Sequence, residues 1–249
     1  MTHNEIINTA KVQLLRDFSC TEADFAAKDT IINKNIPFEG RRIYKSDGCF
    51  VKILCFMGKI IVSCDENMIP FFENWLRGKT SAWLFQYDKL KELERELNKH
   101  GHTIADIHEY YLPTGNADTK PMNYALRWFD QQSIFQFETD DRITESFAFD
   151  KNHPDMIAVG AYDGENLMGM AGASCDGEDL WQIGIDVFPP YKGRGIGSNL
   201  TRELKEAILA KNKVPFYGTV QSHMISKSVA IKAGFMPAWS ELYTMKLKP

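Results

Sequence analysis

Long apolar segments are missing from this 249-residue sequence, as are other features that define particular protein classes. No stretch approaches the roughly 18–20 apolar residues that a membrane-spanning helix needs. The first residues carry no basic segment followed by an apolar run, so no signal peptide is expected. Repeats and biased tracts are also missing, and a composition of 44% hydrophobic and 25% charged residues is typical of a folded globular protein. We therefore expect a cytoplasmic protein that does not bind membranes.

A basic excess is lacking too. Lys and Arg number 29 against 33 Asp and Glu, which gives a net charge of −4. Proteins that bind duplex nucleic acid usually need surplus positive charge to neutralise phosphates, so no nucleic-acid partner is expected. The five cysteines form no Cys-x-x-Cys pair, and no Cys/His cluster has the spacing of a zinc site. We expect reduced thiols and no metal site.

A polar segment rich in turn-forming residues, at residues 113–121, divides the chain and is bounded by two prolines. It predicts an N-terminal α/β domain at residues 1–112, a linker at 113–121 and a second domain at 122–249. For the first domain, the patterns predict elements whose joint function the sequence does not reveal. They are a helix that starts with a Thr2–Glu5 capping box, a hairpin around Gly58, helices at 67–76 and 88–98, and a strand at 103–112.

The second domain is punctuated more clearly. Asp-Gly pairs separate three apolar, β-prone runs at 156–162, 167–175 and 180–188, which predicts an antiparallel meander. The later elements are predicted from periodicity and breakers. They are an amphipathic helix from Ile196 to Ile208, a strand at 214–220, a short helix at 226–233 and a final strand at 239–247. The predicted fold class is α/β (α+β), with a mixed sheet and flanking helices in the second domain.

The segment between the third run and the amphipathic helix reads Lys-Gly-Arg-Gly-Ile-Gly-Ser at residues 192–198. Three glycines let the backbone turn tightly and expose successive N–H groups at a helix N-terminus, where the helix dipole also favours an anion. Each such dipole–charge contact contributes about 0.3–1 kcal/mol. The pattern favours a phosphate-binding loop over its simpler alternative, a glycine-rich turn without a ligand.

Two other phosphate-binding motifs do not match this loop. A P-loop needs a Lys directly before the Ser or Thr, and no Lys precedes Ser198. A dinucleotide fingerprint needs Gly-x-Gly-x-x-Gly within a parallel βαβ unit, whereas the glycines here are spaced Gly-x-Gly-x-Gly after a meander.

The run from Val187 to Gly197, placed between a strand and a helix, resembles the acyl-CoA pyrophosphate loop of the GNAT N-acetyltransferase superfamily, Gln/Arg-x-x-Gly-x-Gly/Ala, with Lys192 at the first position. The segment from Ser226 to Phe235 resembles the family's second CoA-side helix and its terminal Gly-Phe, with His223 where an Asn often stands. The resemblance covers about residues 122–249, and an N-terminal α/β extension is similar to that of a bacterial branch of the family.

The resemblance implies that acetyl-CoA is the cosubstrate and that its pantetheine arm lies between the strand ending at Val187 and the strand at 214–220. Backbone groups of Ile185 and Val187 would pair with that arm, and the N–H near Val187 would face the thioester oxygen. The residues implied in CoA binding are Ile185, Val187, Lys192, Gly193, Arg194, Gly195, Ile196, Gly197, Ser198, His223, Ser226 and Ser228.

The catalytic groups are less well defined by the sequence. The candidates for a base are Asp186, which lies between apolar residues and has a structural role as its alternative, and the turn acids Glu178 and Asp179. The tyrosine with which many family members protonate the leaving thiolate is replaced by Ala230. Substitutes for it are Ser226, Ser228, His223 and Tyr217.

The resemblance implies transfer of an acetyl group from acetyl-CoA to a primary amine, by direct attack in a ternary complex. The acceptor is expected to be a small-molecule or peptide amine; the sequence does not identify it, the acyl-chain length or the oligomeric state. Two alternatives stay open: an acyl-CoA sensor or partner-binding module with little or no catalysis, and a nucleotide-binding module.

Overall fold

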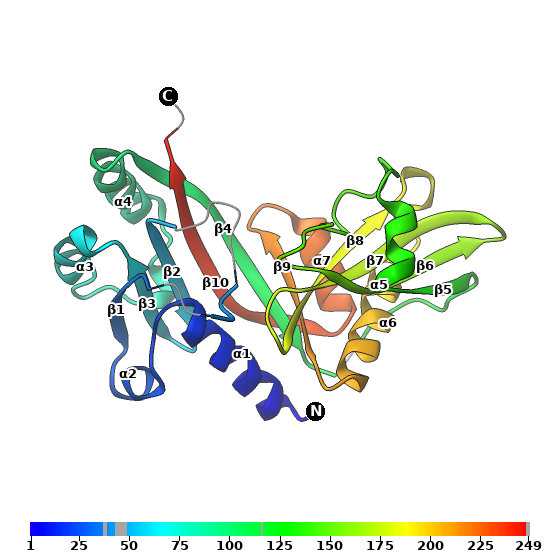
Figure 1. Cartoon of the computed structure of the whole chain (residues 1–249), viewed down its shortest axis with the longest axis horizontal. Helices are drawn as coiled ribbons and strands as arrows, with labels where there is room; N and C mark the ends of the chain where they lie inside the picture. The colour runs from blue at the N-terminus through cyan, green and yellow to red at the C-terminus, as the bar shows by residue number, and fades with distance from the viewer. Residues whose placement is uncertain (37–38, 43–48, 116, 248–249) are drawn as a thin grey trace. The chain divides into compact units, whose positions relative to one another are not determined.

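The computed structural model describes residues 1–36, 39–42, 49–115 and 117–247. The chain divides into two compact units, whose elements are labelled in Figure 1. Unit 1 comprises residues 1–10 and 111–237, and unit 2 comprises residues 11–110 and 238–249. These ranges differ from the expected ones at both ends, because the first residues group with the second half of the chain and the last residues with the first half.

Unit 2 is organised around strands in the order β1-β3-β2-β10-β4. The strands are β1 (Thr30–Lys34), β2 (Val51–Phe56), β3 (Lys59–Cys64), β4 (His102–Pro113) and β10 (Phe235–Lys246). The predicted hairpin is confirmed, since β2 and β3 pair antiparallel. Its turn residues Met57 and Gly58 both have positive φ, at 50° and 79°, as the tightest hairpins require. Strand β1, which pairs parallel to β3, was not predicted.

The last strand belongs mostly to a different unit from the one expected. Residues Trp239 to Tyr243 pair antiparallel with β2, from Phe56 to Lys52, so this segment joins the strands of unit 2 rather than those of the predicted second domain. Leu242 is fully buried in the same apolar core as Ile53 and Val62. The physical reason is that an alternating strand pattern indicates only that one face of the strand is buried. It does not indicate which other strand pairs with it.

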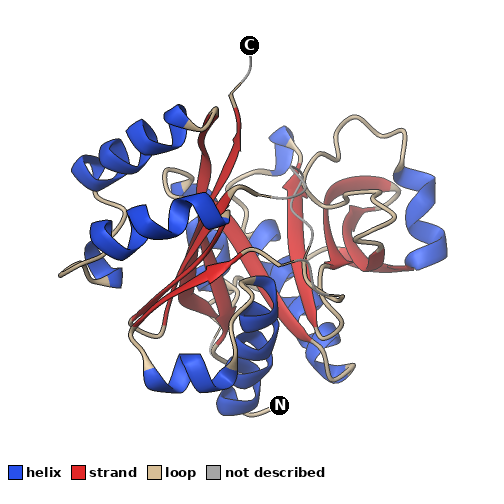
Figure 2. Cartoon of the chain, turned by 60° about the vertical axis from the view of Figure 1, so that its left-hand side comes forward, coloured by secondary structure: helices blue, strands red, loops and turns tan. Residues whose placement is uncertain are grey.

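Helices cover the sheet of unit 2, as Figure 2 shows by secondary structure. They are α2 (Glu22–Ala27), η1 (Glu66–Met68), α3 (Ile69–Trp75), η2 (Ser81–Trp83) and α4 (Tyr87–Lys99). The helices predicted at 67–76 and 88–98 are confirmed as α3 and α4, and they bury Phe72, Leu93 and Leu97 in the core. The first helix, α1 (His3–Asp17), starts with the predicted capping box: Thr2 N donates to Glu5 Oε2 at 2.6 Å and Glu5 N to Thr2 Oγ1 at 3.3 Å.

Unit 1 has strands in the order β9-β8-β7-β6-β5. They are β5 (Ala125–Asp130), β6 (Asp155–Asp163), β7 (Asn166–Cys175), β8 (Leu180–Val187) and β9 (Val214–Val220). Strands β6, β7 and β8 form the predicted antiparallel meander, and β9 pairs parallel to β8. The expected mixed sheet is therefore confirmed. Strand β5 and the short helices after it, α5 (Gln131–Ile134) and η3 (Phe135–Phe137), were not predicted.

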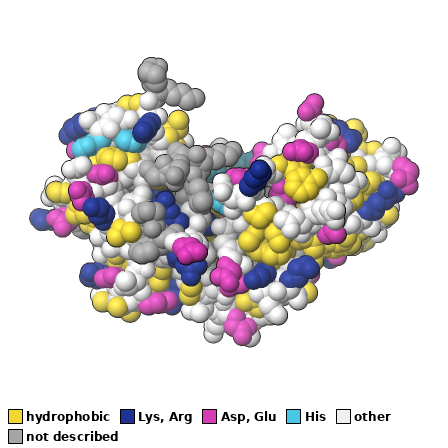
Figure 3. Space-filling view, viewed as in Figure 1, with side chains coloured by type: hydrophobic (Ala, Val, Ile, Leu, Met, Phe, Trp, Pro, Cys, Tyr) yellow, Lys and Arg dark blue, Asp and Glu magenta, His cyan; other side chains and the backbone are white. Residues whose placement is uncertain are grey.

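Two helices of unit 1 position the site, α6 (Ile196–Ala210) and α7 (Met224–Lys232). Helix α6 buries Leu200, Leu204 and Ile208 in the same core as Ile183 of β8, which confirms the predicted amphipathic helix. Within the described residues no helix is long and apolar enough to cross a membrane. On the face shown in Figure 3, acidic and basic side chains are interspersed.

The placement of β10 predicts where a core substitution will act. Leu242→Ala removes a fully buried side chain from the core of unit 2 and should cost about 2–5 kcal/mol there. Hydrogen exchange should become faster at the amides of β2 and stay unchanged at those of β7. Leu247→Ala, at a side chain that is 45% exposed, is the control and should change neither. Faster exchange in β7 with β2 unaffected would contradict this assignment.

Candidate functional site

Strands β8 and β9 part halfway along their length. Their parallel pairing runs from Leu180↔Val214 to Ile183↔Tyr217 and stops there, although β8 continues to Val187. Phe188 N donates to Met168 O of the neighbouring strand segment at 3.0 Å. Because backbone groups alternate sides along an antiparallel strand, Ile185 and Val187 direct theirs away from β7, toward the gap. The predicted divergence of the two strands is confirmed, and it leaves a strand edge that can pair with an extended ligand.

The predicted loop follows directly. The short helix η4 (Pro189–Tyr191) leads into it, and Gly193 and Gly195 have φ of 77° and 85°, a left-handed conformation that glycine adopts without strain. The first backbone bond of α6 runs from Asn199 N to Gly195 O at 3.1 Å. Within the described chain, the amides of residues 193–198 have no acceptor. Free amides at a helix N-terminus form a site for an anion.

Basic side chains surround this loop. Lys192 and Arg194 are exposed, and the Arg194 guanidinium donates to Pro190 O at 3.1 Å and lies over the Tyr191 ring, 5.5 Å from its centroid. Arg194 is therefore folded back along the turn, while Lys192 extends into solvent. The Ser198 hydroxyl donates its proton to Gly195 O at 3.0 Å, so it has no proton left to donate to a ligand.

Lys120 is a further basic residue at the loop that sequence reasoning missed. The carbons of its side chain lie 3.1–3.3 Å from the point where a Cβ on Gly195 would stand, so its stem rests directly on the loop. The segment is held there by Asp118 N, which donates to Lys232 O at 2.8 Å. Nothing in the sequence connects residue 120, in the expected linker, with a loop more than seventy positions later.

Asp186, the strand acid, is fully engaged in hydrogen bonds and is 9% exposed. Its carboxylate accepts from the backbone amides of Thr144, Glu145 and Ser146 at 3.2, 3.0 and 2.8 Å. It also accepts from the hydroxyls of Thr144 and Ser146 at 3.0 and 2.7 Å. This is the structural role held open as the alternative, and we do not assign Asp186 as a base. The segment that it holds, Thr144–Ser146, is called the arch from here on.

The arch crosses the sheet over two glycines. A Cβ on Gly184 would lie 1.8 Å from Glu145 O, and a Cβ on Gly172 would lie 2.1 Å from Ser146 O. Any side chain at either position would push the arch away, so these glycines are required for the close approach. Gly184 is the first residue of β8 beyond its pairing with β9, so the arch passes beside the start of the gap. Glu145, at its centre, was not recognised from the sequence.

The turn acids lie far from the gap. Glu178 and Asp179 come before β8, and Asp179 forms an ion pair with Lys213 at 2.6 Å. At about 3.3 Å per strand residue they are about 25 Å from Val187. We therefore place both candidates outside the site. The reason is that a meander puts its turns at the sheet ends, opposite to the end where the loop begins.

On α7, Ser226 is held at the site by Tyr217. The Tyr217 hydroxyl and Ser226 Oγ are 2.9 Å apart, and burial raises the pKa of the Tyr217 phenol. His223 is exposed directly before α7 and Ser228 is half-buried within it. Within the described residues neither side chain forms a hydrogen bond, so their predicted contacts with a cofactor stay predictions.

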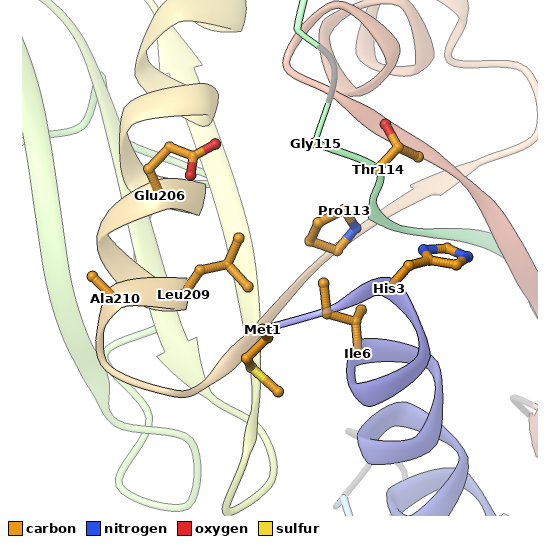
Figure 4. Close-up of a pocket in the computed structure, with 9 residues that line it drawn as sticks. All are labelled: Met1, His3, Ile6, Pro113, Thr114, Gly115, Glu206, Leu209 and Ala210. Carbon is orange, nitrogen blue, oxygen red and sulfur yellow. The ribbon is translucent and has the colours of Figure 1, made fainter.

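A separate pocket of about 460 Å³ lies at the other end of α6 (Figure 4). Its lining residues come from the chain start and the first turn of α1, the end of β4 with the two residues after it, and the last turns of α6. They are Met1, His3, Ile6, Pro113, Thr114, Gly115, Glu206, Leu209 and Ala210. Since the loop precedes the first turn of α6, this pocket is not part of the gap or of the anion site.

Comparison with known proteins gives the following. A model of the acetyltransferase (GNAT) family matches residues 121–235. Among solved structures, a GCN5-related N-acetyltransferase-like protein from Streptococcus suis has a TM-score of 0.46 at 11% identity, with 77% of this chain and 83% of that chain covered. A GNAT-family acetyltransferase from Colwellia psychrerythraea has a TM-score of 0.43 at 13% identity, with 58% and 57% covered.

A third similar structure, from Salmonella typhimurium, was solved with acetyl-CoA. It has a TM-score of 0.35 at 13% identity, with 51% of this chain and 95% of that chain covered. None of the curated proteins matches the sequence.

The five hydrogen bonds to Asp186 predict a measurable contribution to stability. Asp186→Asn replaces an acceptor by an amide donor opposite backbone N–H groups, which should lower the free energy of unfolding by about 2–4 kcal/mol. Urea denaturation measures this. Asp163→Asn, an exposed acid at the end of β6, is the matched control and should stay within about 0.5 kcal/mol of wild type. Equal effects of the two substitutions would show that the arch is not held by Asp186.

Proposed function

We propose that this protein transfers an acetyl group from acetyl-CoA to a primary amine, and the match of residues 121–235 to a model of the acetyltransferase (GNAT) family supports this. The observation that supports this most directly is the parting of β8 and β9 immediately before an anion-binding loop. An acyl-CoA needs both features, a place for a diphosphate and an extended channel for the pantetheine arm. The acceptor is proposed to be a small-molecule or peptide amine, and the cytoplasm is the proposed location.

The residues of the gap suit coenzyme A. The free amides of residues 193–198 and the charge of Lys192 would hold the diphosphate. The backbone groups of Ile185 and Val187 face the gap and would pair with the amide groups of the pantetheine arm. The N–H of Val187 would then stabilise the charge that develops on the thioester oxygen.

The proposed route is direct attack by the amine in a ternary complex, without an acyl-enzyme. Cys175 pairs with Trp181 at the end of the sheet away from the loop, and burial raises the pKa of its thiol, which keeps it protonated. Ser226 is hydrogen-bonded to a tyrosine hydroxyl and not to a basic group that would activate it. Neither side chain has the setting of a nucleophile.

The loop predicts how coenzyme A binding will respond to a substitution. Gly195→Ala forces a residue with a Cβ into a left-handed conformation at the centre of the anion site, and should weaken binding of CoA about tenfold. Gly164→Ala introduces the same strain in the hairpin between β6 and β7, where a Cβ meets no atom within 4 Å, and should leave binding unchanged. Titration calorimetry with CoA, ATP and NAD measures both variants. Preference for ATP or NAD over CoA would contradict the proposal and favour a nucleotide-binding module.

Turnover is tested separately by release of the CoA thiol from acetyl-CoA in the presence of a panel of alkylamines and peptides with free amines. We expect at least one amine to accelerate release. Tight CoA binding with no acceleration by any amine would instead identify an acyl-CoA sensor without catalysis.

A further inference from the structure

The gap between β8 and β9 has different neighbours on the two faces of the sheet. Side chains alternate between faces along a strand. Ile183, Ile185 and Val187 pack into the core that contains Ile196 of α6 and Ala230 of α7, so this is the helix face of the gap. Asp186 and Gly184 point the other way, toward the arch. The gap is therefore bordered by the helix core on one face and by the arch on the other.

Glu145 is the acid on the arch face. Its amide donates to Asp186 at 3.0 Å and its carbonyl lies over Gly184, which fixes the residue beside the point where the strands part. The side chain is exposed, and among the described residues its carboxylate takes part in no hydrogen bond or ion pair. Its negative charge contributes to raising the pKa of Tyr217, after the larger effect of burial.

Tyr217 is the corresponding group on the helix face. It pairs with Ile183 in the last step of the β8–β9 ladder, and its side chain is 3% exposed within the core under α6 and α7. Its hydroxyl lies 2.9 Å from Ser226 Oγ. Burial is the largest cause that raises the pKa of this phenol, so it holds its proton at neutral pH and can donate it. Ala230, one turn after Ser226 on α7, has no acidic proton to donate.

We propose that Glu145 accepts the proton of the attacking amine from the arch face, and that Tyr217, hydrogen-bonded to Ser226, donates a proton to the departing CoA sulfur from the helix face. The inference rests on the proposed function and assigns its base and its acid. Asp186 is a positioning residue in this scheme, because it acts only by holding the arch that carries Glu145.

The proton balance of the step closes. Before attack, the ammonium form of the amine, which predominates at pH 7, gives one proton to the Glu145 carboxylate. The nitrogen–carbon bond then forms and the carbon–sulfur bond breaks; nitrogen releases its second proton to solvent, and sulfur takes the proton of Tyr217. The proton on Glu145 then passes through solvent to the tyrosinate, which restores both groups. The products are the amide and the free thiol of coenzyme A.

The test compares Glu145→Gln and Tyr217→Phe with wild type, using acetyl-CoA and the alkylamine that gives turnover in the panel. Both substitutions preserve shape and remove the proton-transfer group, so kcat should fall about 10²–10⁴-fold. The dissociation constant of acetyl-CoA, measured by calorimetry, should stay within about twofold, since neither side chain is proposed to hold the cosubstrate. Glu138→Gln, an exposed acid just before the arch, is the matched control and should behave as wild type.

A pH profile separates a base from a structural support. An alkylamine with a pKa near 10.4 becomes neutral without help as the pH rises, at about tenfold more free base per pH unit. The deficit of Glu145→Gln relative to wild type should therefore shrink between pH 7 and pH 10, whereas the deficit of a damaged fold would not. The deficit in kcat of Asp186→Asn should also shrink over this pH range, because this substitution acts through the position of Glu145.

The outcomes are distinct. If wild type releases no thiol with any amine, the proposed function fails and this assignment fails with it. If wild type turns over and Glu145→Gln or Tyr217→Phe retains full kcat, the function stands and the assignment of that residue is overturned. A deficit that appears in the acetyl-CoA dissociation constant instead of kcat would likewise overturn it, because the side chain would then be a binding residue.

Discussion

Strands β8 and β9 exchange no hydrogen bonds beyond Ile183 and Tyr217, and the site depends on that interruption. Unpaired backbone N–H and C=O groups need hydrogen-bond partners. The gap between two strands presents a row of such groups in a fixed register. Here the gap is bordered by Ile185 and Val187 and ends at a turn whose amides are also unsatisfied. This backbone geometry would suit a long, polar ligand with an anionic end, which is the basis of the proposal of acetyl-CoA.

The arch links that gap to ionisable chemistry. A buried carboxylate is stable only with several donors, and Asp186 obtains five of them by binding Thr144–Ser146. The same contacts bring a second acid, Glu145, to the gap with its side chain left unoccupied. Asp186 has a structural role, and Glu145 is the acid proposed as the base. The sequence of the strand, which contains only Asp186, does not distinguish these two roles.

Local signals in the sequence predicted local structure well. The Thr2–Glu5 capping box, the turn at Gly58, the meander and the glycine loop each depend on residues within a few positions of one another, and all are present. Contacts between distant segments could not be predicted in this way. Lys120 on Gly195, Glu145 over Gly184, and the pairing of Trp239 with Phe56 each require knowing which segments the fold brings together. The sequence identified Asp186 as a candidate, but not its role, because that role comes from hydrogen bonds to the arch and the arch carries no recognisable motif.

The grouping of the last strand with the first half of the chain has a consequence for biosynthesis. The β10 residues that pair with β2 follow their partners by more than 180 positions, so the sheet containing β2 cannot be completed until they have left the ribosome. Until then, one edge of β2 is without its neighbour, and such an edge is prone to pair with other nascent chains. The interval between translation of Phe56 and of Trp239 is therefore the period in which this protein is most exposed to misassembly.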